Sequence, residues 1–95
     1  RIVAAAEAEA VGLVTSVEDD PLQAAQAIAA EIAGKSPDAI RAMKALINES
    51  WEGDDAVALR REAELQIGVM AGDNQKEAVL ANMEKRTPSF SDPKV

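Results

Sequence analysis

The sequence predicts an all-α fold, a small bundle of about four helices with a short extended N-terminal segment. Three observations predict it. Between the glycines and prolines, apolar residues recur at three- and four-residue intervals, which is helical spacing. Proline twice follows a capping residue, at Asp20–Pro21 and Ser36–Pro37, an order typical of helix starts. Only the run LVTSV at 13–17 is short and β-branched, so we expect it to be extended.

The first third of the chain contains two predicted helices. A helix over 1–10 (RIVAAAEAEA) is expected to end at Gly12, before the extended LVTSV segment. Asp20 is expected to cap the next helix, which starts at Pro21 and ends at Gly34. Its predicted apolar face consists of Leu22, Ala25, Ile28, Ala29 and Ile32.

Ser36 is expected to cap the third helix, which begins at Pro37 and stops at Gly53. We interpret this serine as a cap and not as a carrier-protein attachment site, because no Asp-Ser-Leu sequence surrounds it. The predicted apolar stripe of this helix is Ile40, Met43, Ile47 and Trp51, with Leu46 and Ser50 beside it.

The fourth helix is the longest, capped by Asp54 or Asp55 and closed by Gly72. It is apolar on two sides, so one side is expected to face this chain and the other to face another chain. The two stripes are Leu59, Ala63, Ile67 and Met70 on one side and Leu65 and Val69 on the other.

Asp73 is expected to cap the last helix, which ends before Pro88 and leaves the final residues as a tail. Val79, Leu80 and Met83 form its predicted apolar face.

The composition predicts a thin core. The hydrophobic fraction is 47%, but 20 residues are alanines and only one Trp and one Phe are present. A large aliphatic side chain contributes about 1.5–3 kcal/mol when fully buried, and alanine contributes much less. The chain has no cysteine, so no disulfide stabilises it. Partner contacts are therefore the expected support.

The charge balance excludes several partner classes. The net charge is −7 and the pI is about 4.5, which argues against nucleic acids and anionic membranes as partners. No apolar run approaches the ~20 residues of a membrane span, and no signal peptide is visible. We expect a cytoplasmic protein. The chain starts at Arg1 instead of Met, so we expect a processed, trimmed or partial chain.

No catalytic or metal-binding set is predicted. Without His or Cys, neither a nucleophilic triad nor a zinc site is possible. Glu62 and Glu64 are two residues apart, so on a helix they point in different directions, and Glu7 and Glu9 share this spacing. These carboxylates are interpreted as solvated helix faces.

Lys85 and Arg86 end the last predicted helix and allow two readings. Cations at a helix C-terminus stabilise it by about 0.3–1 kcal/mol through the helix dipole. Alternatively, they hold an anion. Composition favours the first reading.

Four segments give the chain a more specific character. They are AAEAEAVGLVTSV (5–17), GKSPDAIRAMKALIN (34–48), LRREAELQ (59–66) and DNQKEAVLANMEKRTPSF (73–90). In this order and spacing they resemble the enoyl-CoA hydratase/isomerase (crotonase) family. The matching residues are Ala5, Glu7, Ala8, Gly12, Leu13, Val14, Val17, Ser36, Pro37, Ala39, Lys44, Glu62, Glu77, Ala81, Glu84, Lys85, Arg86, Pro88 and Phe90.

The resemblance implies that the chain is the C-terminal part of such an enzyme. Residues 1–20 would be a helix and extended segment trailing from an absent core domain, and 21–95 a helical oligomerisation region of the kind that assembles trimers or hexamers. The complete enzyme, a lyase or isomerase of fatty acid metabolism, would act on acyl-CoA with no covalently bound cofactor. Its catalytic residues would lie outside these 95 residues.

The resemblance also implies one binding residue. In some relatives the lysine of the closing segment approaches the CoA phosphates or adenine, which here assigns CoA binding to Lys85. An aromatic residue that lines the acyl-CoA site in such relatives would fall at Gln66, and the sequence departs from the family there. Ala78 and Asn82 replace a family glycine and phenylalanine. The alternative function is a free-standing, non-catalytic helical oligomerisation or adaptor domain.

Overall fold

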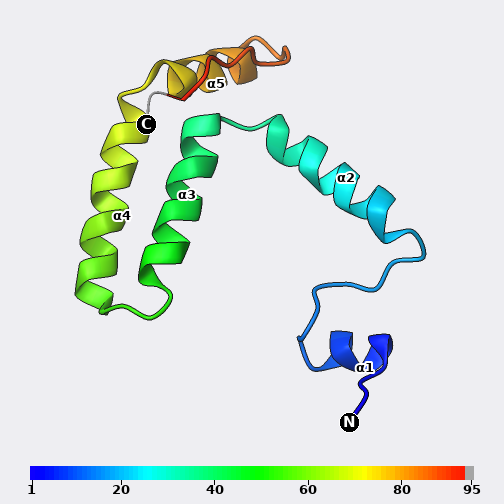
Figure 1. The fold of residues 1–95 in the computed structure, drawn as a ribbon. Coiled ribbons are helices and arrows are strands. Elements are labelled where there is room, and N and C mark those ends of the chain that lie inside the picture. The colour runs from blue at the N-terminus through cyan, green and yellow to red at the C-terminus, as the bar shows by residue number, and fades with distance from the viewer. Residues whose placement is uncertain (94–95) are drawn as a thin grey trace. The chain divides into compact units, whose positions relative to one another are not determined.

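A computed structural model describes residues 1–93 and confirms the predicted all-α class, because this part of the chain has helices and no strand (Figure 1). The helices are α1 (Ala5–Ala10), α2 (Pro21–Ala33), α3 (Pro37–Ser50), α4 (Asp55–Met70) and α5 (Asp73–Met83). The chain divides into two compact units, Arg1–Glu31 and Ile32–Val95, and each is described by itself.

In the first unit, α1 begins at Ala5, later than predicted, and it ends before Gly12, as predicted, in a Schellman turn. Gly12 has a φ of 75° and donates its N–H to the Glu9 carbonyl at 3.0 Å. The next amide, of Leu13, reaches back to the Ala8 carbonyl at 2.8 Å. Ala8 is buried beneath this turn. The following LVTSV segment consists of bends and irregular backbone, and the Val17 amide bonds the Glu9 side chain at 3.3 Å instead of a neighbouring strand.

Helix α2 starts as predicted. Asp20 accepts the Gln23 amide at 3.0 Å, which satisfies one of the free N–H groups of the first turn. None of its residues is buried, and its predicted apolar face is open: Leu22, Ile28 and Ile32 keep 68%, 59% and 46% of their surface exposed. The helix is therefore formed by its cap and its alanines, not by a core within this chain.

In the second unit, α3 and α4 lie side by side and run in opposite directions (Figure 1). Asp54 caps α4 by accepting the amides of Ala56 and Val57 at 2.9 and 3.2 Å, as predicted. On α4 the half-buried apolar residues are Ala58, Leu65 and Val69, and the last two are the second of the two predicted stripes. The first stripe is exposed, so only one of the two apolar sides is covered by residues of this chain.

The predicted apolar stripe of α3 is covered only in part. Ile40 is half-buried, but Met43, Ile47 and Trp51 are exposed, Trp51 to 82%. The half-buried side chains toward the hairpin interior are instead Ala42, Ala45, Leu46 and Ser50. The distance between packed helices depends on the side chains at the contact, so the small alanines allow the backbones of α3 and α4 to approach closely. Of the larger side chains, Leu46 is half-buried, whereas Ile47 and Trp51 remain exposed.

Two predicted caps differ from the structure, one in its chemistry and the other in its place. Ser36 is the N-cap of α3, and its carbonyl accepts the Ile40 amide at 3.1 Å, but its side chain makes no capping bond. Its hydroxyl is buried without a partner among the described residues. At α5 the N-cap is Gly72, and Asp73 is the first helical residue, where its charge favours the positive end of the helix dipole.

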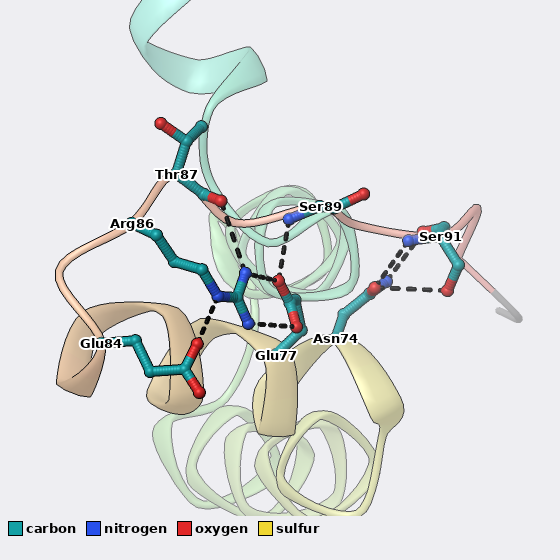
Figure 2. A network of polar contacts seen from close by, with 7 residues as sticks. All are labelled: Asn74, Glu77, Glu84, Arg86, Thr87, Ser89 and Ser91. Carbon is teal, nitrogen blue, oxygen red and sulfur yellow. Dashed lines mark hydrogen bonds and ion pairs between the residues drawn. The ribbon is translucent and has the colours of Figure 1, made fainter.

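The chain folds back along α5 after the helix ends (Figures 1 and 2). The face that it covers contains Asn74, Glu77 and Ala81, which are three and four residues apart. Asn74 is buried, donates to the Ser91 carbonyl at 2.8 Å and accepts the Ser91 amide at 2.9 Å. It also donates to Asp38 of α3 at 2.8 Å.

The predicted apolar face of α5 is therefore not the face that packs in this chain. Val79, Leu80 and Met83 keep 49%, 47% and 74% of their surface exposed. The backbone of the returning segment carries amide and carbonyl groups, and these need polar partners when they are covered. A polar face of α5 supplies such partners, and an apolar face would not.

Asn74→Ala tests this attachment. The change leaves the Ser91 amide, the Ser91 carbonyl and Asp38 without their shared partner, so we expect the free energy of unfolding to fall by about 1–3 kcal/mol. The Ser91 amide should also exchange its hydrogen faster. Urea denaturation and hydrogen-exchange mass spectrometry measure the two effects. Asn82→Ala, on the exposed side of the same helix, is the control. Equal losses for both variants would contradict the role of Asn74.

Candidate functional site

Lys85 follows α5 in a backbone conformation that is rare for its residue type. Its φ is 54°, and no other non-glycine residue among 1–93 has a positive φ. Its amide donates to the Asn82 carbonyl at 3.3 Å, and the Arg86 amide donates to the Ala81 carbonyl at 3.0 Å. These two bonds define a Schellman turn with Lys85 at the left-handed position.

The same turn ends α1, with Gly12 at the equivalent position. Left-handed backbone costs an L-residue with a side chain roughly 1–2 kcal/mol, and glycine avoids this cost. The turn after α1 therefore has an unstrained glycine at the left-handed position, and the turn after α5 has a strained lysine there. Strained residues of this kind concentrate at functional sites, where the side chain serves another purpose.

The Lys85 side chain is not needed to satisfy the end of α5. The carbonyls of Leu80, Ala81 and Asn82 already accept backbone amides, including the amide of Lys85 itself. The Lys85 side chain is exposed and makes no hydrogen bond or ion pair with residues 1–93. Its ammonium group is thus available to a molecule outside this chain.

Arg86 has the opposite surroundings (Figure 2). Its guanidinium group donates to both carboxylate oxygens of Glu77, at 2.5 and 3.2 Å, and to Glu84 at 2.5 Å. The Glu77 carboxylate also accepts the Ser89 amide at 2.9 Å. The hydrogen bond from Arg86, and then that from Ser89, lowers the pKa of Glu77 to about 2. The pKa of Arg86 is raised, chiefly by Glu77 and then by Glu84. Arg86 is therefore a salt-bridging residue of the turn after α5.

A second feature is an open groove between α3 and α4. It has a volume of about 320 Å³ and is lined mainly by apolar side chains. The apolar lining consists of Ala39, Ala42, Met43, Leu46, Leu65, Val69 and Met70. Gln66, at the position of the family's acyl-site aromatic, lines the same groove beside Glu62. Lys85 does not line it, so the structure does not bring Lys85 and Gln66 into one cavity.

The four glutamates examined in the sequence form no catalytic pair in the described region. Glu62 lines the groove, whereas Glu64 lies 3.6 Å from Arg61 and lines a different cavity. Glu7 is paired with Arg1, which lowers the pKa of the carboxyl group, and Glu9 accepts the Val17 amide.

No group of three or more His, Cys, Asp or Glu residues within 1–93 is arranged to hold a metal ion. The same residues contain no helix of the length and apolarity that a membrane crossing requires.

Sequence reasoning missed Asn74 and Ser89 and gave Glu77 no role in the network. One signal was present. Asn74, Glu77, Ala81 and Glu84 are spaced by three, four and three residues, which places polar groups along one side of a helix just before a proline-containing tail. That pattern indicates a side of the helix suited to receiving backbone amides.

Lys85→Gly tests the strain at the turn. Glycine keeps the left-handed conformation without steric cost, so we expect the free energy of unfolding to rise by about 1 kcal/mol. Lys85→Ala also removes the charge but keeps the strain, and should not stabilise the protein. Thermal and urea unfolding measure both variants. A glycine variant no more stable than the alanine variant would show that the turn is not strained.

The family described as enoyl-CoA hydratase/isomerase matches residues 1–93. The probable enoyl-CoA hydratase echA8 of Mycobacterium leprae (strain TN) is 40% identical over 93 residues, which are 96% of this chain and 36% of that protein. Mevalonyl-coenzyme A hydratase SIDH of Beauveria bassiana (strain ARSEF 2860) is 38% identical over 69 residues, 70% of this chain and 25% of that protein.

Solved structures agree. An enoyl-CoA hydratase from Polaromonas sp. JS666 superposes with a TM-score of 0.82 and 27% identity, covering 94% of this chain and 35% of that one. EchA1 from Mycobacterium marinum gives a TM-score of 0.82 and 28% identity, covering 93% and 36%. The chain thus spans 36% of the length of the first curated relative, and 96% of the chain itself is matched. It belongs to the enoyl-CoA hydratase/isomerase family.

Proposed function

We propose that these residues are the C-terminal helical part of an enoyl-CoA hydratase/isomerase-like enzyme that acts on acyl-CoA thioesters. The observation that carries this proposal is the family match over residues 1–93, which corresponds to only about a third of the relatives' length. The remaining part of the enzyme would supply the oxyanion hole and the acidic groups that add water to a double bond or move a proton. This part would supply no catalytic residue.

The first proposed role is assembly. Among residues 1–93 the buried hydrophobic residues are Ala8 and Ala81, both beneath Schellman turns, whereas large apolar side chains on each of the longer helices are exposed. Contiguous exposed apolar surface marks an interaction site in soluble proteins. The outer sides of α3 and α4, which include Trp51 and Ile67, would be covered by the rest of the enzyme and by neighbouring copies. A trimer or a hexamer is the proposed assembly.

The second proposed role is to cover the substrate. The apolar groove between α3 and α4 has side chains suited to an acyl chain or to the pantetheine arm, and polar groups from Glu62 and Gln66 at its border. Ligand pockets combine apolar walls with a few polar groups in this way. In the assembled enzyme this groove would form one wall of the acyl-CoA site.

The third proposed role is to hold the CoA end of the substrate through Lys85. Coenzyme A carries phosphate groups, and a charge-assisted contact with an ammonium group suits them. Lys85 is the cation that the turn leaves unpaired, whereas its neighbour Arg86 is bound by two carboxylates. On a chain with a net charge of −7, an exposed cation at a strained position is an unusual feature that such a contact would explain.

Lys85→Ala in the full-length enzyme tests this role. The contact is exposed, so we expect the KM for acyl-CoA to rise about 3- to 10-fold while kcat at saturation stays unchanged. Steady-state kinetics measures both parameters. Lys76→Ala is the matched control, because Lys76 is an exposed lysine of α5 whose only described partner is Asp73 at 3.8 Å. An unchanged KM in the Lys85 variant would count against CoA binding.

The rival function is a free-standing helical oligomer without chemistry. The exposed apolar sides favour it as well, because self-association alone would cover them. The intact mass of the natural product separates the two. A product several times longer than 95 residues, with CoA affinity, supports the enzyme. A product of this length that forms a discrete oligomer without CoA affinity supports the rival.

A further inference from the structure

The turn after α5 places two cations next to each other and gives them different tasks. Lys85 is strained and has no ion pair with residues 1–93, whereas Arg86 bonds the side chains of Glu77 and Glu84. Its Nε donates to Glu84, which precedes Lys85. Its Nη1 and Nη2 donate to Glu77, which lies within α5. Its Nη1 also lies 3.5 Å from the Thr87 carbonyl.

These bonds enclose the backbone of Lys85. Glu84 precedes it and Arg86 follows it, and their side chains are joined at 2.5 Å. Glu77 then fixes the chain beyond the turn by accepting the Ser89 amide. Without these contacts, only two backbone bonds, of 3.3 and 3.0 Å, would hold a lysine in a conformation that costs it energy. The ion pairs are additional contacts across the same turn.

We propose that Arg86 and Glu77 are positioning residues, which hold the left-handed turn so that Lys85 alone presents its charge to the phosphates of coenzyme A. This inference rests on the proposed function of Lys85. It assigns Arg86 no contact with the ligand, although Arg86 is the stronger anion-binding side chain by type.

Direct phosphate binding by Arg86 is the competing explanation, and the contacts oppose it. Its Nε and both Nη atoms already donate to carboxylates, in a two-pronged geometry with Glu77. Glu77 keeps its charge at neutral pH, because its pKa is about 2. A phosphate that approached Arg86 would meet two carboxylates within hydrogen-bonding distance of the same group, and their charges would repel it.

A double-mutant cycle in the full-length enzyme tests the proposal, with the Kd for free coenzyme A measured by titration calorimetry. Arg86→Gln and Glu77→Gln are each made alone and together with Lys85→Ala. Alone, each should weaken binding about 3- to 10-fold and leave kcat at saturating acyl-CoA unchanged. In the Lys85→Ala background, each should change Kd less than about twofold, since residues that act through one group are not additive.

Two further variants separate positioning from charge and from general destabilisation. Arg86→Lys keeps the charge but cannot bridge two carboxylates with a planar fork, so it should bind coenzyme A as weakly as Arg86→Gln. Arg61→Gln breaks the comparable pair with Glu49, at 2.7 and 3.2 Å, far along the chain on α4. It should leave the Kd unchanged.

The outcomes distinguish this inference from the function it rests on. If Lys85→Ala alone leaves the Kd unchanged, both are overturned. Suppose that Lys85→Ala weakens binding, and that Arg86→Gln weakens it by the same factor with or without Lys85. Arg86 then contacts the phosphate itself, and only the positioning role is overturned. If Arg86→Gln and Glu77→Gln leave the Kd unchanged, or if Arg86→Lys restores it, the positioning role is overturned as well.

Discussion

The Glu77 carboxylate holds the end of this chain in place. It accepts hydrogen bonds from the Arg86 guanidinium and from the Ser89 amide, so a single side chain joins the turn after α5 to the returning segment (Figure 2). One helical turn earlier, Asn74 does the same for Ser91 and extends the attachment to α3 through Asp38. Polar contacts thereby determine the course of the tail, in a chain that buries little apolar surface.

Local signals predicted the helices well, because helix starts and ends depend on nearby residues. Asp20 and Asp54 cap as expected, and Gly12 adopts the left-handed conformation of a helix end. The spacing of apolar residues, however, predicts which residues share one side of a helix. It does not predict which side packs against the rest of the chain. Most of the predicted apolar stripe of α3 and all of that of α5 are exposed. The packing partner inside this chain is an alanine-lined hairpin in one case and a polar backbone in the other.

The site was predictable only in part, for the same reason. The resemblance to the family named Lys85, and the structure adds its backbone strain and its lack of an ion pair. Nothing local indicates that Arg86 pairs with Glu77, nine residues earlier, because that contact exists only once the tail has folded back. Two Schellman turns, one with glycine and one with lysine, differ in their backbone cost, because only glycine adopts the left-handed conformation without a steric penalty.

The most direct test of this account is the pH titration of the Glu77 side-chain carboxyl carbon by NMR. The account predicts a pKa near 2, below the ordinary value of 4.5. A lowered folded-state pKa means that the ion pair contributes its full stability above about pH 4.5 and loses it as the pH falls toward 2. In Arg86→Gln the midpoint should move back toward 4.5. A midpoint at 4.5 in the unmodified protein would show that Glu77 does not hold the closing segment, and would contradict the account.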